Sequence, residues 1–346
     1  MNKHIIIHDP TLRDGNHAVR HQLTTDNFRK YCIAAEAAGV PVVEVGHGNG
    51  LGASSMLVGE SLITDDEILK ISRENLKTSK LSMHVIPGFA TIKRDLIKAI
   101  DLGVDIFRVG AHVTEADICQ RHIEYVRKSN KTAFGVLMMS HMASINTLVS
   151  EARKMQSYGA EALMIMDSSG HYFPEDVTDR ITALVNGLDI PVGFHGHNNL
   201  GMAVSNSVAA VRAGASILDG TVRGFGAGAG NTQLEVLVAV LHRLEYTTGI
   251  DLYKILDAAD LAGREFNPEP PFISSMSVVS GLSGVFSGFT KHVATAAKDY
   301  NVDPRDIFFE LGKRKAVAGQ ESIIFEVAQE LAASKENISG SNLTLL

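Results

Sequence analysis

Short apolar runs alternate along the chain with segments of helical periodicity. Eight of these runs precede or end in glycine, histidine or an acidic residue: Ile5–His8, Val42–Gly46, Leu81–Ile86, Ile106–Val109, Ala133–Met138, Ala162–Met166, Val192–Phe194 and Ser216–Leu218. The runs are continuously apolar and do not alternate in polarity, which is typical of parallel strands covered on both faces. We therefore predict eight buried strands.

The segments between these runs carry the signals of amphipathic helices. Thr25 can cap a helix that ends at Gly39, and another apolar helical face begins at Leu200 and ends at Gly214. Eight strands alternating with helices over the first 250 residues predict a (β/α)8 barrel, whose usual size is about 250 residues. An open doubly wound sheet is the alternative, but it would gather polar residues at one switch point, whereas here they follow nearly every strand.

The chain changes character after about residue 250. A proline-rich stretch, residues 267–271, is typical of a linker, and helical patterns such as Ser322–Ala333 follow it. We predict a catalytic barrel over residues 1–250 and a C-terminal helical appendage over residues 251–346 that covers the barrel mouth or contacts a partner.

Composition and charge narrow the class of protein. The chain has 346 residues, of which 45% are hydrophobic, enough for a large core. Its net charge of −7 gives no electrostatic footprint for nucleic acid or an anionic membrane, and no segment approaches the ~20 apolar residues of a membrane span. Two isolated cysteines, Cys32 and Cys119, suggest no disulfide framework. We expect a cytoplasmic protein that binds neither nucleic acid nor a membrane.

The sharpest chemical signal is the pattern His195-Gly196-His197 at the end of the seventh strand. Histidines two apart on a strand project to the same face, and barrels carry their chemistry at the carboxyl ends of strands. Two imidazoles and one carboxylate suit a Mn, Fe, Co or Zn ion, with Asp14 as the leading carboxylate. Spacing alone leaves three other carboxylates open: Asp9, Asp167 and Asp219. The alternative is a pair of hydrogen-bonded histidines without a metal.

The residues around Asp14 offer groups for catalysis. Arg13 can reach the same site only if the backbone has left the strand, which Gly15 permits. An arginine there would stabilise negative charge on a carboxyl or enolate oxygen, and its alternative role is a structural ion pair. His17 is the candidate proton-transfer group because imidazole titrates near neutral pH, although a loop histidine can also be merely exposed. No strand ends in lysine, so a Schiff base has no obvious candidate.

The glycine-rich run at residues 224–231 follows the last strand and precedes a helix. Barrels often bind phosphate at this position. The alternative is that the glycines allow backbone to pack tightly under the metal site. The sequence leaves both interpretations open.

Seven segments in combination resemble one enzyme family. They are TLRDGNHAVRHQ, GHGNGLGASS, LMMSHM, DSSG, HGHNNLG, GAGAGN and LGKRKAVAGQE. Together they resemble the 4-hydroxy-2-oxovalerate aldolases, metal-dependent pyruvate aldolases of aromatic and steroid catabolism. The wider resemblance is to the superfamily of hydroxymethylglutaryl-CoA lyases and isopropylmalate synthases, and it covers essentially the whole chain.

The resemblance implies roles for individual residues. Asp14, His195 and His197 match the family's metal ligands, usually for Mn²⁺, with Co²⁺, Mg²⁺ or another divalent cation as alternatives. Arg13 matches the residue that stabilises the pyruvate enolate, and His17 matches the catalytic base. Asn231 matches a ligand of the lyase relatives and is implied as a ligand or a neighbour of the ligands. The implied substrate-binding residues are Arg13, Asp14, Ser168, His195 and Phe286.

The reaction that the resemblance implies is reversible cleavage of a 4-hydroxy-2-oxoacid to pyruvate and an aldehyde. The 2-oxoacid would chelate the metal, and His17 would remove the proton of the C4 hydroxyl. The C-terminal appendage resembles the one with which family members contact an acylating acetaldehyde dehydrogenase, and an oligomer is expected. Phe286 stands where relatives have tyrosine, which leaves stereospecificity and the natural aldehyde open.

Two other functions remain open. One is a CoA-dependent Claisen lyase or synthase of the same superfamily, which would turn over a thioester. The other is a non-catalytic partner that regulates a dehydrogenase through the appendage, although Asp14, His195 and His197 are all present and argue against it.

Overall fold

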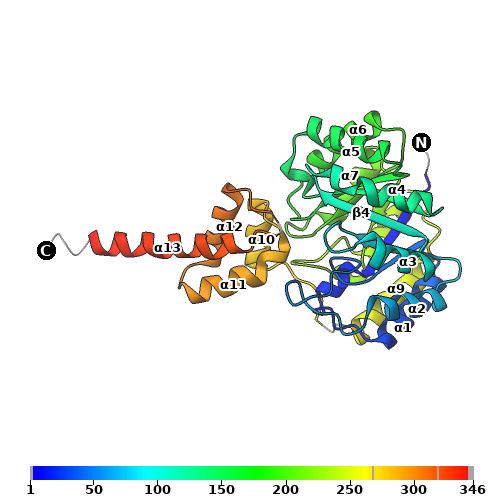
Figure 1. Cartoon of the computed structure of the whole chain (residues 1–346), viewed down its shortest axis with the longest axis horizontal. Helices are drawn as coiled ribbons and strands as arrows, with labels where there is room; N and C mark the ends of the chain where they lie inside the picture. The colour runs from blue at the N-terminus through cyan, green and yellow to red at the C-terminus, as the bar shows by residue number, and fades with distance from the viewer. Residues whose placement is uncertain (1–2, 267–268, 318, 342–346) are drawn as a thin grey trace.

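Eight parallel strands close into a barrel that forms the body of the molecule (Figure 1). The structure is a computed structural model that describes residues 3–266, 269–317 and 319–341. The strands are β1 Ile6–Leu12, β2 Val42–Val45, β3 Lys80–Val85, β4 Ile106–His112, β5 Thr132–Met138, β6 Ala162–Asp167, β7 Val192–Gly196 and β8 Ile217–Asp219. Because β1 pairs with β8, the predicted (β/α)8 barrel is confirmed and the open doubly wound sheet is wrong.

Helices surround the barrel and alternate with its strands. They are α1 Thr25–Ala38, α2 Asp65–Asn75, α3 Ile97–Asp101, α4 Gln120–Lys128, α5 Ile145–Ser157, α6 Pro174–Gly187, α7 Ala203–Arg212 and α8 Leu234–Arg243. The cap of α1 is Thr24 and not Thr25, because the Thr24 hydroxyl accepts from the Asn27 N–H while the Asn27 side chain accepts from the Thr24 N–H. Gly39 ends this helix with a φ of 76°. No helix in the described ranges is long and apolar enough to cross a membrane.

The inside of the barrel changes from apolar to charged toward the carboxyl ends of the strands. Alternate residues of a strand point inward, so positions two apart share the interior. An apolar cluster fills its lower part: Val42, Ile106, Phe134, Val136, Ala162, Met164, Met166 and Ile217. Two residues further along β2, β4 and β8 come Glu44, Arg108 and Asp219, none more than 1% exposed. On each of these three strands, the next inward-facing residue is therefore a buried charged residue beneath the barrel mouth.

His8 belongs to this interior and makes the stability of the fold sensitive to acid. Burial and then the nearby charge of Arg108 lower the pKa of His8 to about 4, and neither ring nitrogen has a hydrogen-bond partner. The folded protein therefore keeps His8 neutral in a range where the unfolded chain protonates it. Because the unfolded state binds more protons, this histidine makes the free energy of unfolding fall as the pH drops below about 6.5 toward about 4.

We expect His8→Leu to reduce this acid sensitivity, by at most about 1.4 kcal/mol per pH unit, while changing stability near neutral pH little. Urea unfolding at about pH 7 and about pH 5 measures the difference. His242→Gln, at the exposed end of α8, is the control and should keep the wild-type pH dependence. An unchanged pH dependence in His8→Leu would show that His8 does not contribute to it.

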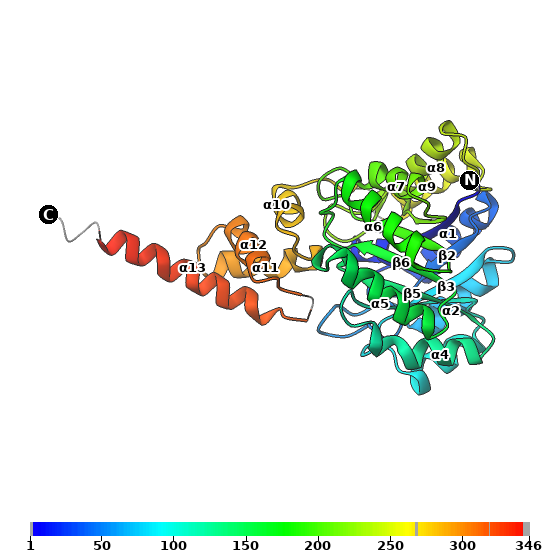
Figure 2. The same cartoon turned by 90° about the horizontal axis from the view of Figure 1, so that it is seen from above.

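The C-terminal helices form two groups. Helix α9, Leu252–Glu265, packs on α1, and its buried residues Ile255, Ala258 and Ala262 belong to the core around the barrel. The remaining helices have a hydrophobic core of their own: α10 Ser275–Ser283, α11 Thr290–Asp299, α12 Pro304–Lys313 and α13 Ser322–Ser341. Figures 1 and 2 both show them as a separate lobe beside the barrel, with α13 pointing away from it.

The division of the chain after residue 250 stays a prediction, and the packing of α9 argues for a later boundary. A cut after residue 250 would expose the apolar faces of α1 and α9 that cover each other. We propose that the barrel unit includes α9 and that the appendage begins after it. Residues 267 and 268 of the proline-rich linker lie outside the described residues.

Candidate metal and substrate site

Asp14, His195 and His197 converge at the carboxyl end of the barrel. One ligand atom from each of the three side chains lies within 4.8 Å of the other two, and all three residues are buried. His195 lies in β7, His197 follows that strand, and Asp14 opens the 3-10 turn η1, Asp14–His17, directly after β1. The structure therefore brings together the three residues that the sequence proposed as metal ligands.

The protonation states of these three side chains suit a divalent cation. Although burial raises the pKa of Asp14, the adjacent Arg13 guanidinium and the two histidines hold it well below its usual range. Burial lowers the pKa of His197 to about 4, so its imidazole is neutral at pH 7. His195 Nε2 and His197 Nδ1 are buried without a hydrogen-bond partner in the described structure. Unpaired imidazole nitrogens beside an anionic carboxylate are the donor set of Mn²⁺, Fe²⁺, Co²⁺ and Zn²⁺ sites.

The three alternative carboxylates point to other partners. Asp9 accepts a hydrogen bond from the Tyr31 hydroxyl at 2.5 Å, which ties β1 to α1. Asp167 accepts from two backbone N–H groups of the turn that follows β6. Asp219 accepts from His195 Nδ1 at 2.9 Å and so lies behind the histidine. This contact keeps the proton on Nδ1 and turns Nε2 toward Asp14, as carboxylates that bind the far nitrogen of a ligand histidine do in metal sites.

Arg13 reaches the site because the backbone has left the strand where η1 begins. Its Nη1 donates to Asp14 Oδ2 at 2.5 Å and to the Gly48 carbonyl at 3.2 Å, and its Nε donates to Glu44 Oε1 at 2.7 Å. Only 4% of Arg13 is exposed, and Nη2 is buried without a partner. The side chain forms ion pairs, as its structural interpretation predicted, and also keeps one donor for an anionic ligand.

His17 closes η1 and belongs to a cluster of three histidines. Its ring contacts His21 edge-on with centroids 4.9 Å apart, and His21 stacks on His47 at 3.7 Å. Burial lowers the pKa of His17, although Asp14 opposes the shift. Gly48 leaves room for the ring, since a Cβ there would lie 2.4 Å from His17 Nε2. Sequence reasoning missed His21, and its spacing of four from His17 was the available signal.

Asn231 and the glycines before it shape the binding site around Asp14. Asn231 Nδ2 donates to Asp14 Oδ1 at 3.0 Å and to the Phe225 carbonyl at 2.9 Å, so the amide orients the carboxylate. A Cβ at Gly226 would lie 2.3 Å from Asn231 Nδ2 and 2.9 Å from Asp14 Oδ1. Close backbone packing is therefore the interpretation of the glycine-rich run that these contacts support.

Ser168 and Phe286 make contacts of their own outside the group of three converging side chains. The Ser168 hydroxyl accepts a hydrogen bond from the Met139 N–H at 3.0 Å and so joins the loops after β5 and β6. The Phe286 ring contacts Phe289 with centroids 5.9 Å apart, inside the appendage. Among the described contacts, none joins Ser168 or Phe286 to Asp14, so their substrate-binding roles stay predictions.

The appendage contacts the loops of the barrel mouth. His141 Nε2 donates to the Gly284 carbonyl at 2.8 Å, and His171 Nδ1 donates to the Gly281 carbonyl at 2.7 Å. Asn199, two residues after His197, donates to the Ser277 carbonyl at 3.2 Å and also contacts Ser280 and Ser287. The segment that carries a candidate metal ligand is therefore tied directly to the appendage.

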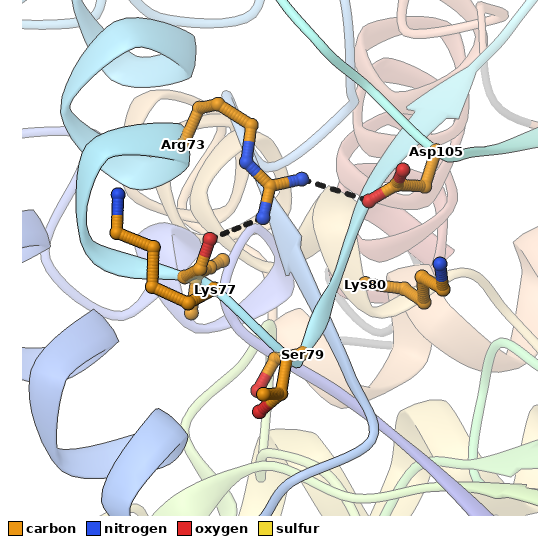
Figure 3. A pocket seen from close by; sticks show the side chains of 7 residues that line it. Arg73, Lys77, Ser79, Lys80 and Asp105 are labelled. Atoms are coloured by element: carbon orange, nitrogen blue, oxygen red, sulfur yellow. Dashed lines mark hydrogen bonds and ion pairs between the residues drawn. The ribbon is translucent and has the colours of Figure 1, made fainter.

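A pocket at the opposite end of the barrel offers no comparable chemistry. Figure 3 shows Arg73 pairing with Asp105 at 2.9 Å beside Lys80, the first residue of β3. This is the amino end of the strands, where barrel residues generally serve stability. The ion pair of Arg73 with Asp105 therefore serves as a structural comparison for the ion pairs of Arg13 and Arg108 near the mouth.

The fold and the site define a barrel enzyme with a candidate divalent-cation site at the carboxyl ends of its strands. Family models match the chain as HMGL-like over residues 4–262 and as a DmpG-like communication domain over residues 271–333. The chain belongs to the HMGL-like family and, within it, to the 4-hydroxy-2-oxovalerate aldolases, which are carbon–carbon lyases.

Individual relatives support this assignment. A protein of Pectobacterium atrosepticum named 4-hydroxy-2-oxovalerate aldolase is 71% identical over 97% of this chain and 98% of its own length. A Spirochaeta aurantia protein of the same name is 61% identical over 94% and 96%. Among solved structures, the carboxyl transferase domain of Rhizobium etli pyruvate carboxylase with oxamate and biotin has a TM-score of 0.80 and 16% identity. It covers 96% of this chain and 61% of that one, and shows the fold alone.

Proposed function

We propose that this chain cleaves a 4-hydroxy-2-oxoacid reversibly to pyruvate and an aldehyde with the help of a divalent cation. Asp14, His195 and His197 would hold the ion, with Mn²⁺ as the expected metal and Co²⁺ or Mg²⁺ as possible substitutes. The observation that carries the proposal is the unpartnered Nη2 of Arg13 beside these three side chains. The same buried site thus offers ligands for a cation and a hydrogen-bond donor for an anionic group of the substrate.

The bound ion would supply a Lewis acid that stabilises negative charge on the substrate. Arg13 adds a second positive group, fixed by its bonds to Asp14 and Glu44, so it needs little reorganisation as charge develops. Asn231 holds the Asp14 carboxylate in place from the other side. These contacts fit the enolate-stabilising role that the sequence predicts for Arg13.

His17 would act as the base in cleavage and as the acid in the reverse reaction. It takes the proton of the C4 hydroxyl, directly or through a water molecule, as the C4 oxygen forms the aldehyde carbonyl. The electrons of the C3–C4 bond pass to the 2-oxo group, which becomes the enolate beside Arg13. Protonation at C3 then gives pyruvate. The lowered pKa of His17 keeps the imidazole neutral near pH 7, as a base must be.

We propose that the appendage binds an acylating acetaldehyde dehydrogenase-type partner that consumes the aldehyde. The match of residues 271–333 to a communication domain supports this, and so do its contacts with the mouth at His141, His171 and Asn199. Co-purification of the two proteins tests it, and an aldolase without α10–α13 should fail to retain the dehydrogenase. Assembly into a homo-oligomer, the cytoplasmic location and a role in aromatic catabolism stay predictions.

Removal of the metal tests the proposed reaction. We expect dialysis against EDTA to abolish pyruvate release from 4-hydroxy-2-oxovalerate, and added Mn²⁺ to restore it, because the substrate charge loses its main stabilisation. Pyruvate can be followed with a coupled lactate dehydrogenase. Activity that survives EDTA unchanged would exclude the proposal. Release of free thiol from acetyl-CoA with a 2-oxoacid would instead identify the Claisen alternative.

Phe286→Tyr tests the departure from the family pattern. Phe286 lies two residues after Gly284, whose carbonyl His141 binds, and the family pattern implies a tyrosine hydroxyl at this position. We expect the tyrosine to sharpen discrimination between the two C4 enantiomers by about 10-fold, since one hydrogen bond contributes about 1.4 kcal/mol. Rates with each enantiomer measure it, and Phe272→Tyr, in the exposed linker, is the control. Equal discrimination in all three proteins would exclude this role.

A further inference from the structure

Arg108 is a buried arginine that the proposed mechanism does not use. It lies in β4, is 0% exposed, and is the largest fully buried side chain in the described structure. Its Nη2 pairs with Asp219 Oδ2 at 2.6 Å, and its Nη1 lies 3.2 Å from Glu44 Oε2. One guanidinium therefore joins carboxylates from two strands, β2 and β8, that are not neighbours of β4 in the barrel.

Each of these carboxylates holds a different residue of the candidate site. Glu44 binds Arg108 with one oxygen and Arg13 Nε with the other, at 2.7 Å. Asp219 accepts from Arg108 and from His195 Nδ1, both through Oδ2. Arg108 is thus linked through Glu44 to Arg13, which we call the catalytic arm, and through Asp219 to His195, which we call the metal arm.

The two arms meet again at Asp14. Its Oδ2 pairs with Arg13 Nη1 at 2.5 Å and lies 3.9 Å from His195 Nε2. The contacts form a chain of six buried side chains, Asp14, Arg13, Glu44, Arg108, Asp219 and His195, whose two ends face each other across the candidate metal site. Such pairing is required for charges in a barrel interior, because each unpaired charge there would be strongly unfavourable.

We propose that Arg108 is a positioning residue that fixes the positions of Arg13 and His195 relative to each other from beneath the site. It touches neither substrate nor metal and acts through Glu44 and Asp219. Its Nη2 donates a hydrogen bond to Asp219, and its Nη1 forms an ion pair with Glu44 without the geometry of a hydrogen bond. Two nitrogens of one planar guanidinium thus lie beside both carboxylates, whereas a lysine offers a single ammonium group. The inference rests on the proposed function for its catalytic arm and on the Asp14, His195 and His197 site for its metal arm.

The decisive variant is Arg108→Lys, which keeps the buried positive charge and removes the fork. We expect the Kd for Mn²⁺, measured by titrating the metal-stripped protein, to rise about 10- to 100-fold, as for other lost second-shell contacts. We also expect kcat/KM for pyruvate release to fall further than Mn²⁺ saturation can restore, because Arg13 is misplaced as well. Arg108→Gln, a shorter neutral donor, gives the same test if the lysine variant does not fold.

Two nearly isosteric variants separate the arms. Asp219→Asn weakens the direct contact with His195 and leaves the contact of Glu44 with Arg13 in place, so we expect mainly weaker Mn²⁺ binding with a nearly unchanged KM at saturating metal. Glu44→Gln weakens the direct contact with Arg13 and leaves the contact of Asp219 with His195 in place, so we expect mainly a raised KM with a nearly unchanged Kd for Mn²⁺. A residue that only supports the fold would not divide its effects in this way.

Arg73→Lys is the matched control. Arg73 pairs with Asp105 at the amino end of the barrel, as Figure 3 shows, away from the proposed site. We expect this variant to lose stability in urea unfolding but to keep the wild-type Kd for Mn²⁺ and the wild-type KM. If Arg108→Lys also changes only stability, or if both single-arm variants leave Kd and KM unchanged, the inference is overturned.

A failure of the proposed function and a failure of the positioning role would give different results. A wild-type protein that binds Mn²⁺ but cleaves no 4-hydroxy-2-oxoacid would refute the proposed function. The titrations of Arg108→Lys and Asp219→Asn would still decide the metal arm in that case. An active wild-type enzyme whose Arg108→Lys variant keeps full Mn²⁺ affinity and KM would instead refute the positioning role alone.

Discussion

Asp14→Asn is expected to lower pyruvate release by about 10³-fold or more and to abolish tight Mn²⁺ binding. The substitution keeps the shape of the side chain and removes the only negative charge of the proposed ligand set. It also removes the ion pair of Arg13 Nη1 with Asp14, which leaves Arg13 held by the Gly48 carbonyl and by Glu44. Initial rates with 4-hydroxy-2-oxovalerate and titration with Mn²⁺ measure the two effects.

The control for this prediction is Asp26→Asn, an exposed acid of the first turn of α1. It should keep wild-type rates and Mn²⁺ affinity. Asp14→Asn should also still bind the dehydrogenase partner, because the described appendage contacts do not involve Asp14. Unchanged turnover in Asp14→Asn would remove this residue from the metal site and reopen the choice among the three other carboxylates.

His17→Gln is expected to lower kcat by about 10²- to 10⁴-fold, the range typical of a lost general base. The pH dependence gives the sharper readout. In the wild type, kcat should fall as the pH drops through the pKa of His17, because only the neutral imidazole accepts the proton. Burial lowers this pKa, so the acid limb should lie below the ordinary range of histidine.

In His17→Gln the acid limb that belongs to His17 should disappear, while the Kd for Mn²⁺ stays at its wild-type value. His21→Gln is the comparison within the same histidine cluster, and His242→Gln is the exposed control. A wild-type kcat and acid limb in His17→Gln would assign the base to another group, with His21 or His47 as the next candidates.

Local patterns were sufficient for the elements of this fold and for part of the site. Continuous apolar runs identify buried parallel strands because both faces of such strands are covered, so the runs predicted all eight. The spacing of His195 and His197 placed both rings on one face, since strand side chains alternate with a period of two. Arg13 was a candidate because it adjoins Asp14, and His17 because imidazole titrates near neutral pH.

Contacts between distant segments decided the rest. Asp14 stands out because its carboxylate lies within 4.8 Å of ligand atoms of His195 and His197. The other three, Asp9, Asp167 and Asp219, accept from α1, from the turn after β6 and from β4. The packing of α9 on α1 likewise extends the barrel core beyond residue 250, where composition suggested a boundary.

By itself the sequence determined the strands, the barrel and the histidine pair, because hydrophobic periodicity and side-chain alternation are local properties. Only the tertiary structure decided that Arg108 lies between Glu44 and Asp219, residues separated by about half of the chain. Barrel closure brings β2, β4 and β8 around one axis, and no local pattern records which inward-facing charges meet there.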